Sequence, residues 1–270
     1  MMSRSLLPLL LSFIFTHVYA GSDWSVKLEK SRMLSNQAAH VFLFTAYKAK
    51  HFPVKITMIM LKSGDHHAGM MVQKKENIED VLTVMQEEKA FLATNGGFYR
   101  ENFRPNGLLI IKGIRRSYFV KNKLLSAIVN IDKGGRLSLL AADQYNGFLQ
   151  KQLYNAFQTG PILIDDGNIE LNLNDYHVAK RVIYALNGDS NLLIFAIDST
   201  TLEDSADIIE TIAKYLHQTI KMAVNFDGGK AAGFATSAFD NPVVFAEMVP
   251  VKTVVYFFED SDTALAWQSR

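Results

Sequence analysis

The chain has 270 residues, with 28 Lys and Arg against 27 Asp and Glu, and it contains no cysteine. The formal net charge of +1 gives no overall field that would attract nucleic acid or an anionic membrane surface, so we expect no nucleic-acid partner. Without cysteine, disulfide bonds and zinc–thiolate sites are excluded, and a hydrophobic core must stabilise the protein. Hydrophobic residues make up 49% of the chain, which is enough for one such core.

Residues 1–20 have the organisation of a secretory signal peptide. Arg4 supplies a positive charge, residues 6–15 form a short apolar run, and Val18-Tyr19-Ala20 places suitable side chains at the positions that a signal peptidase recognises. An uncleaved N-terminal anchor is the alternative, but the apolar run is short for a membrane span. We therefore expect cleavage after Ala20 and export to the periplasm or the medium. The mature domain, residues 21–270, should not stay inserted in a membrane.

The first predicted elements are two strands and a helix. Apolar and polar residues alternate over residues 41–47 and 54–61, as in half-buried strands. Asn77 then provides a helix N-cap, with Glu79 and Asp80 in the first turn. One face of this helix is apolar and carries Ile78, Val81, Leu82 and Met85.

Three β-hairpins are predicted between residues 128 and 197. In each of them, two β-rich segments flank Gly, Asp or Asn residues, which accept a positive φ angle. The paired segments are residues 128–131 with 137–140, residues 161–164 with 169–171, and residues 182–186 with 192–197.

A second helix is predicted over residues 205–217. Ser205 or Asp204 is its N-cap, because both side chains can accept hydrogen bonds from the first turn. Its apolar residues recur at helical spacing and comprise Ile208, Ile209, Ile212, Tyr215 and Leu216.

Each helix is followed by a short buried strand, an Asn and paired glycines. We expect both strands to end at a common edge of one mixed, mainly antiparallel sheet, where their polar tips form a site. The fold class is therefore α+β, with a few packed helices and a single domain. Ordinary turns are the structural alternative for the two tips, which are Asn95-Gly96-Gly97 and Asn225-Phe226-Asp227-Gly228-Gly229.

Four blocks of sequence occur in order between residues 94 and 229. They are TNGGFY at 94–99 with PNGL at 105–108 and KG at 112–113, AFQTGPIL at 156–163 closing on DG at 166–167, KRVIYA at 180–185, and VNFDGG at 224–229. Together they resemble the phosphodiester glycosidase family, in particular its exported bacterial members.

The resemblance implies an α+β fold and hydrolysis of a sugar-1-phosphodiester bond of the N-acetylglucosamine type. In this reaction water attacks the anomeric carbon and phosphate leaves. Many family members have Ser or Thr after the last glycines, whereas Lys230-Ala231-Ala232 follows here, which leaves the identity of the sugar open. The expected partner is a glycan or a sugar phosphodiester.

This chemistry needs a carboxylate near the anomeric carbon and cationic or N–H groups at the phosphate. Asp227 is the first candidate for the carboxylate, with an Asx-turn as its structural alternative. Arg181 is the candidate for the phosphate because its planar fork can bind two oxygens, unless it is only a solvated residue at a strand end. Asp198 is the candidate for a second carboxylate, unless it only begins the loop before the second helix.

The other predicted site residues bind the substrate. Glycine pairs can present backbone N–H groups to an anion, and Asn side chains can orient a sugar hydroxyl or a water. Gln158 precedes a stiff Thr-Gly-Pro turn, which fixes its amide either for substrate or as a turn cap. These predicted residues are Asn95, Gly96, Gly97, Gln158, Gly160, Asn225, Gly228 and Gly229.

No cofactor is expected. Residues 65–67, Asp-His-His, lack a spaced third ligand and are interpreted as a solvated turn, and His177 is interpreted as structural. Two other functions stay open. One is a non-catalytic envelope protein of the same fold that binds a glycan, and the other is a hydrolase dependent on a divalent cation held by Asp227 and Asp198.

Overall fold

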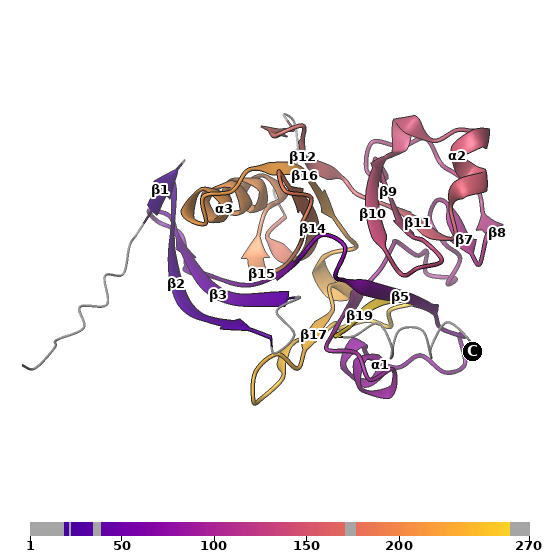
Figure 1. The fold of residues 1–270 in the computed structure, drawn as a ribbon, viewed down its shortest axis with the longest axis horizontal. Helices are drawn as coiled ribbons and strands as arrows, with labels where there is room; N and C mark the ends of the chain where they lie inside the picture. The colour runs from indigo at the N-terminus through magenta and orange to yellow at the C-terminus, as the bar shows by residue number, and fades with distance from the viewer. Residues whose placement is uncertain (1–18, 22, 35–38, 171–176, 260–270) are drawn as a thin grey trace, which may run out of the picture.

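The computed structural model describes residues 19–21, 23–34, 39–170 and 177–259. Within this part of the chain, three antiparallel sheets and three helices confirm the predicted α+β class and the mainly antiparallel pairing. The largest sheet curves around helix α3, which covers one of its faces. The two smaller sheets lie on the opposite side of this sheet from α3 (Figure 1). The predicted signal peptide lies outside the described residues, apart from Tyr19 and Ala20, which belong to strand β1.

The nine-stranded sheet separates two hydrophobic cores. Along β15, Phe195 and Ile197 pack with α3, whereas Ile194 and Ala196 pack with residues of the other sheets, as the two-residue period of a strand requires. The predicted hairpin of residues 182–186 and 192–197 is confirmed as β14 and β15. In sheet order the strands are β1 (Tyr19–Gly21), β2 (Trp24–Met33), β3 (Ala39–Tyr47), β4 (Val54–Leu61), β15 (Leu192–Thr200), β14 (Ala179–Asn187), β16 (Ile220–Asn225), β12 (Ile162–Asp165) and β13 (Asn168–Ile169).

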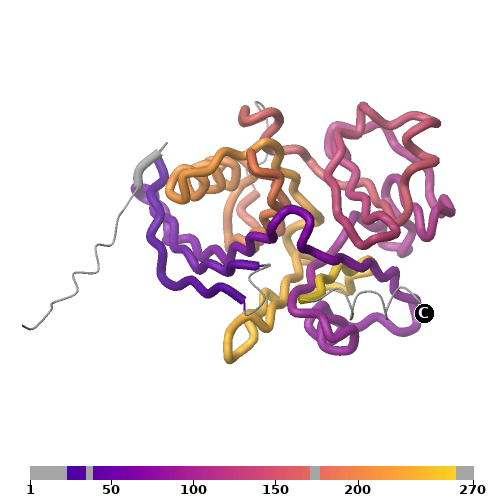
Figure 2. The backbone as a smooth tube through the Cα atoms, viewed as in Figure 1, coloured from indigo at the N-terminus to yellow at the C-terminus, as the bar shows by residue number. Residues whose placement is uncertain are grey.

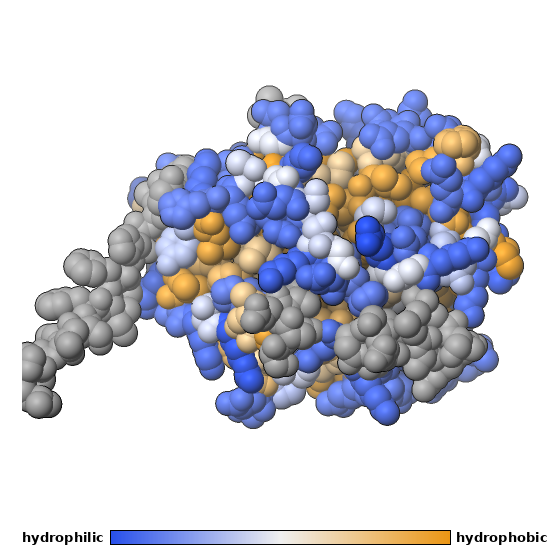
Figure 3. Space-filling view, viewed as in Figure 1, coloured by the Kyte–Doolittle hydropathy of each residue, from blue (hydrophilic) through white to orange (hydrophobic). Residues whose placement is uncertain are grey.

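A five-stranded sheet forms a lobe beside the large one, and the chain crosses back from β11 to β12 (Figure 2). One predicted hairpin is confirmed in this sheet as β9 with β10, and another is confirmed at the edge of the nine-stranded sheet as β12 with β13. Apolar side chains gather at the surface over β9 and β10, with hydrophilic ones around them (Figure 3). The lobe also contains a short helix that was not predicted, α2 (Gly147–Gln152). Its strands, in sheet order, are β10 (Leu137–Ala141), β9 (Ala127–Ile131), β11 (Asn155–Thr159), β7 (Leu109–Ile111) and β8 (Ile114–Ser117).

The third sheet corrects one prediction. β6 and β16 do not share a sheet: β6 pairs with β17 and β19, whereas β16 pairs with β12 and β14. A buried strand can be recognised from its apolar residues, but its partner depends on long-range packing that the local pattern does not contain. In sheet order the strands are β18 (Val243–Phe245), β17 (Phe234–Thr236), β6 (Leu92–Asn95), β19 (Thr253–Phe258) and β5 (His67–Val72).

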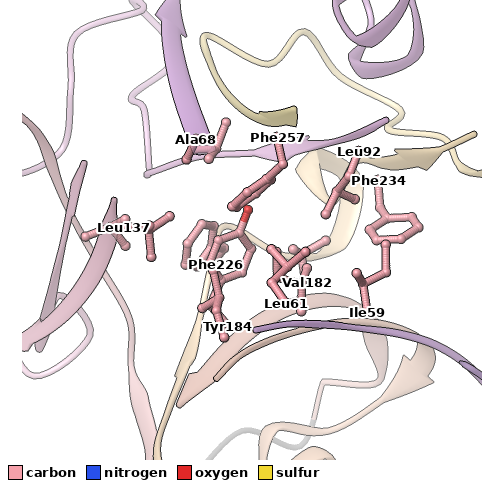
Figure 4. Packing of buried hydrophobic residues seen from close by; sticks show 14 of the residues in the cluster. Ile59, Leu61, Ala68, Leu92, Leu137, Val182, Tyr184, Phe226, Phe234 and Phe257 are labelled. Atoms are coloured by element: carbon pink, nitrogen blue, oxygen red, sulfur yellow. The ribbon is translucent and has the colours of Figure 1, made fainter. Parts of the chain in front are cut away.

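A shared aromatic core nevertheless brings the ends of β6 and β16 together. Tyr184 of β14 stacks on Phe226, with ring centroids 4.2 Å apart, and Phe257 of β19 packs above them (Figure 4). The Tyr184 hydroxyl lies 2.7 Å from Oγ1 of Thr94 in β6. The two glycine-containing tips are therefore fixed against one core, although their strands belong to different sheets.

Helix α1 (Val81–Glu87) begins later than predicted. Its N-cap is Asp80, whose carboxylate accepts a first-turn backbone hydrogen bond of 2.6 Å, and not Asn77. The reason is tertiary: the Gln73 amide bonds both the N–H and the C=O of Glu79 at 2.8 and 2.9 Å. These bonds use the backbone groups of Glu79 and keep the segment before Asp80 out of the helix.

Helix α3 (Leu202–Tyr215) packs its apolar face on the nine-stranded sheet, as predicted, but its N-cap is Thr201. Thr201 Oγ1 accepts a 3.0 Å hydrogen bond from the Asp204 N–H. The predicted caps, Asp204 and Ser205, lie in the first turn. The Asp204 carboxylate instead accepts hydrogen bonds from Trp24 and Lys48, at 3.0 and 2.9 Å. No helix among the described residues is long and apolar enough to cross a bilayer.

Asp65 lies in an exposed turn, as predicted, but His66 and His67 do not form part of a solvated turn. His66 is buried, its Nε2 accepts a 3.3 Å hydrogen bond from the Leu137 N–H, and its Nδ1 lies 3.3 Å from the Lys62 carbonyl oxygen. Burial lowers the pKa of His66, which keeps the ring neutral and able to accept. This histidine therefore ties β5 to β10.

Candidate active site

A cavity of about 1290 Å³ lies between the ends of β12, β14 and β16 and the lobe. The lobe contributes parts of residues 119–126 and 141–145 to its lining. Five predicted site residues line the same cavity from the nine-stranded sheet and the loop that follows β16. They are Arg181, Asn225, Asp227, Gly228 and Gly229.

Asp227 is a partly buried carboxyl in this cavity. Burial raises its pKa from the ordinary value of 3.8 to about 7, because it disfavours the charged form. Asn95 fixes the backbone around it: its Nδ2 donates to the Asp227 carbonyl at 2.7 Å, and its Oδ1 accepts from the Gly233 N–H at 3.2 Å. A rigidly held carboxyl that titrates near neutral pH is suited to proton transfer.

Arg181 is buried beside the Asp227 loop, with 7% of its surface exposed, so it is not a solvated residue at a strand end. Its Nη2 donates to the His177 carbonyl at 2.8 Å, and its Nε donates to the Thr200 carbonyl at 3.3 Å. A Cβ on Gly228 would lie only 3.2 Å from Nη1. Glycine thus lets the loop of Asp227 approach the guanidinium closely.

Asn225 carries an unsatisfied acceptor at the boundary of the cavity. Its Nδ2 donates to the carbonyls of Gly160 and Phe226. Its Oδ1 is buried and has no hydrogen-bond donor among the residues that the structure describes. A buried acceptor without a donor costs about 1–3 kcal/mol, so this position favours a ligand or a water that supplies a hydrogen bond.

The first glycine pair lies behind the site and not on it. A Cβ on Gly96 would lie 2.6 Å from Thr253 Cγ2, and one on Gly97 would lie 2.8 Å from Phe157 Cδ2. Close packing therefore requires these two glycines, and neither lines the cavity. Of this first tip, Asn95 contacts the Asp227 loop directly, through its hydrogen bond to the Asp227 carbonyl.

Gln158 is also a supporting residue. Its Oε1 accepts hydrogen bonds of 3.1 Å from the N–H groups of Leu108 and Val120. Its Nε2 donates to the carbonyls of Val120 and Leu125 at 2.7 Å. These four bonds use the hydrogen-bonding capacity of the amide, so we assign Gln158 to holding residues 120–125, a wall of the cavity, and not to direct contact with substrate.

Two further predicted residues lie outside the cavity. A Cβ on Gly160 would lie 2.3 Å from the Leu124 carbonyl oxygen, so this glycine lets the residues after β11 approach residues 124–126 of the lobe closely. Asp198 lies in a part of β15 where the pairing with β14 shifts register, and it does not line the cavity. The geometry therefore gives no support to Asp198 as a second catalytic carboxylate. Among the described residues, no group of three or more His, Asp and Glu side chains is arranged to hold a metal ion.

Several cavity residues were not found from the sequence. His177, interpreted as structural, lines the cavity and orients Arg181 through its carbonyl. The only sequence pattern that marks the others is cationic, because residues 112–123 contain five Lys and Arg and no Asp or Glu. The additional lining residues include Phe98, Phe119, Lys121, Lys123, Asp143, Tyr145, Asp165 and Glu170.

Comparison with known proteins identifies the family to which this α+β chain belongs. The sequence profile of the phosphodiester glycosidase family matches residues 88–258. This match covers more than half of the chain, and the protein belongs to that family. A search of curated proteins found no significant match.

Several solved structures share the fold. The catalytic domain of zebrafish N-acetylglucosamine-1-phosphodiester alpha-N-acetylglucosaminidase, auto-inhibited by its pro-peptide, is 15% identical over 86% of this chain and 88% of its own, with a TM-score of 0.60. A hypothetical protein from Synechocystis is 12% identical over 82% of this chain, with a TM-score of 0.62, and the match spans 62% of its own length. A putative exported protein from Burkholderia pseudomallei is 10% identical over 76% of this chain and 74% of its own, with a TM-score of 0.51. At these identities the likeness concerns the fold.

Proposed function

We propose that this protein is an exported hydrolase that cleaves a sugar-1-phosphodiester bond of the N-acetylglucosamine type. One observation carries the proposal: Asp227 and Arg181 line a single cavity, and Gly228 brings the loop of the carboxyl against the guanidinium. A carboxyl suits the sugar side of such a bond, and a guanidinium suits the phosphate side. Family membership and the bond named for the zebrafish enzyme support the same substrate class.

In the proposed reaction Asp227 acts as the general base. Water attacks the anomeric carbon, and the Asp227 carboxylate takes a proton from that water. The bond between the anomeric carbon and the phosphate oxygen breaks, and its electron pair leaves with the phosphate. Arg181 stabilises the charge of the departing phosphate. The products are a free sugar and a phosphate monoester, which is a good leaving group and requires no strong general acid.

Two features of the site support this assignment. A pKa of about 7 lets Asp227 be deprotonated in much of the enzyme near neutral pH while it is still basic enough to accept a proton. Asn225 lines the same cavity, and its buried Oδ1, which has no donor among the described residues, would accept a hydrogen bond from the attacking water or a sugar hydroxyl after a shift of the side chain toward the cavity.

Hydrolysis of an N-acetylglucosamine-1-phosphate diester by wild type and Asp227→Asn tests the proposal. Loss of the base should lower kcat/KM at least about a hundredfold, the scale for one positioned catalytic group. Wild-type kcat/KM should rise as the pH rises through about 7, because only the deprotonated carboxyl is a base. Asp166→Asn removes an exposed carboxyl from the turn after β12 that does not line the cavity, and it serves as the matched control.

Turnover that survives Asp227→Asn, with a folded protein shown by its melting curve, would contradict the assignment. A rate that falls as the pH rises through about 7 would instead make Asp227 a general acid. Saturable glycan binding without turnover of any sugar phosphodiester would favour the non-catalytic alternative.

A further inference from the structure

We infer that the lobe side of the cavity is a second subsite, which binds the part of the substrate beyond the scissile phosphate, and that this part is a glycan carrying further phosphate groups. The inference rests on the proposed function, since it concerns the leaving group of that reaction. It assigns a role to cavity residues that the hydrolytic step does not use.

The first observation is a local concentration of positive charge. Lys121 and Lys123 are exposed and line the cavity; Arg115 and Arg116 are exposed on β8 of the same lobe but do not line it, and Arg115 donates to Gln150 Oε1. Residues 112–123 carry five cations and no acidic residue, whereas the whole chain has a formal net charge of only +1. Such a cluster raises the local concentration of an anionic ligand and binds phosphate oxygens.

The second observation is an aromatic platform in the same lobe. Phe119 and Tyr145 are stacked, with ring centroids 4.5 Å apart and an interplanar angle of 13°, and both line the cavity. The Tyr145 hydroxyl donates a 2.8 Å hydrogen bond to Gln150 Oε1, which fixes the orientation of the ring. Fixed, partly exposed aromatic side chains offer a flat apolar surface to a ring of the ligand.

The third observation is that the cavity is not uniformly basic. Asp165 of β12 and Glu170, one residue after β13, are exposed carboxylates in its lining, and Asp143 of the lobe is a third. Carboxylates repel phosphate but accept hydrogen bonds from sugar hydroxyls. Lysines on one segment and carboxylates on others therefore fit a phosphoglycan, in which hydroxyls separate the phosphates, better than a continuous polyanion such as nucleic acid.

The lysine segment is also held in place before any ligand binds. Gln158 bonds the backbone of Val120 on one side of the lysines and of Leu125 on the other, with distances of 2.7–3.1 Å. A segment fixed at both ends loses less conformational freedom when it binds a ligand. Lys121 and Lys123 thus lie on a segment fixed at both ends, in the lining of the cavity that Asp227 also lines.

The test compares two substrates and two double variants. The short substrate is the methyl diester of N-acetylglucosamine-1-phosphate, and the long one is an oligosaccharide of N-acetylglucosamine units joined by several phosphodiester bonds. Lys121→Ala with Lys123→Ala should lower kcat/KM for the long substrate about tenfold or more, the scale for losing charge-assisted contacts, and change it less than about twofold for the short one. The control is Lys133→Ala with Lys151→Ala, which removes the same charge from exposed positions of the lobe away from the cavity.

A binding measurement separates this inference from the proposed function. Calorimetry gives the dissociation constant of the leaving group alone, an oligosaccharide that ends in a phosphate monoester and carries internal phosphates. If wild type binds it at least about tenfold more tightly than the 121/123 variant, and the 133/151 control binds like wild type, the subsite is supported even if no diester is hydrolysed.

Three results would overturn the inference. The first is equal affinity of wild type and the 121/123 variant for the phosphorylated oligosaccharide. The second is an equal loss of turnover on the short and the long substrate. The third is binding of a single-stranded oligonucleotide of the same charge as tightly as the phosphoglycan, which would make the surface a general polyanion site.

Discussion

The Asp227 carboxyl should make the folded protein less stable at neutral pH than the same protein with an amide in its place. The pKa of this carboxyl is about 7 in the folded protein, against an ordinary value of 3.8 in an unfolded chain. Folding therefore favours the protonated form of Asp227. The contribution of this carboxyl to the free energy of unfolding is fully present below about pH 3.8 and is lost as the pH rises to about 7. At 1.36 kcal/mol for each pH unit, this difference corresponds to about 4 kcal/mol.

Partial exposure of Asp227 lets solvent relieve part of this cost, so we expect about 2–4 kcal/mol. Asp227→Asn stays neutral at every pH. Its free energy of unfolding should therefore match that of wild type near about pH 4 and exceed it by this amount above about pH 7.

Urea unfolding of both proteins across this pH range measures the difference. Asp165→Asn, from the exposed rim of the same cavity, should follow wild type closely, because an exposed charge is already hydrated. A difference between Asp227→Asn and wild type that does not change with pH would refute the reasoning, as would an Asn variant that is less stable above about pH 7. If Asp227→Asn gains stability while it loses turnover, the charged carboxylate of Asp227 destabilises the fold and is retained because catalysis requires it.

The other predictions concern Arg181, helix α3, the supporting residue Gln158 and the N-terminus. Arg181→Lys should lower kcat/KM about tenfold to a hundredfold because a point charge does not replace the fork; steady-state kinetics with an unchanged rate would remove Arg181 from the site. Ile212→Ala, at a residue with 0% exposure, should cost about 2–5 kcal/mol in denaturant unfolding, and a cost below about 0.5 kcal/mol would mean that α3 is poorly packed. Gln158→Leu should cost at least about 3 kcal/mol, measured in the same way, because four backbone groups lose their partner; a neutral effect would show that water replaces the amide. Intact mass of the exported protein should give Gly21 as its first residue, and a mass that includes Met1 would contradict cleavage.

The predictions that succeeded concern local patterns. The hairpins at residues 128–140 and 182–197 were predicted because two apolar segments and a turn lie next to each other in the chain. The apolar face of α3 was predicted because Ile residues that recur at helical spacing lie on one side of a helix, which is then the buried side. The helix starts were wrong where distant residues decide them, as when Gln73 holds Glu79 out of α1.

The candidate site divides in the same way. Asp227, Arg181 and Asn225 were singled out because each stands at a strand end beside glycine or within a family block, and they do line one cavity. Gln158 and Asn95 also belong to family blocks, but their side chains form hydrogen bonds to the backbone and hold neighbouring segments in place. Which way a polar side chain points at a strand end depends on the register and twist of its neighbours, and these are not encoded in the local pattern.

The sequence by itself determined the α+β class, the hairpins, the family and the residues of the Asp227 loop, since these depend on local periodicity, turn chemistry and ordered blocks. Only the tertiary structure decided that β6 and β16 belong to different sheets and that Asn95 joins their tips. It alone brought Lys121 and Phe119 of the lobe into the lining of the same cavity as Asp227. These residues are more than 100 positions from Asp227 in the sequence. Their meeting depends on how three sheets pack around Tyr184, Phe226 and Phe257, and packing of this kind is a property of the whole chain.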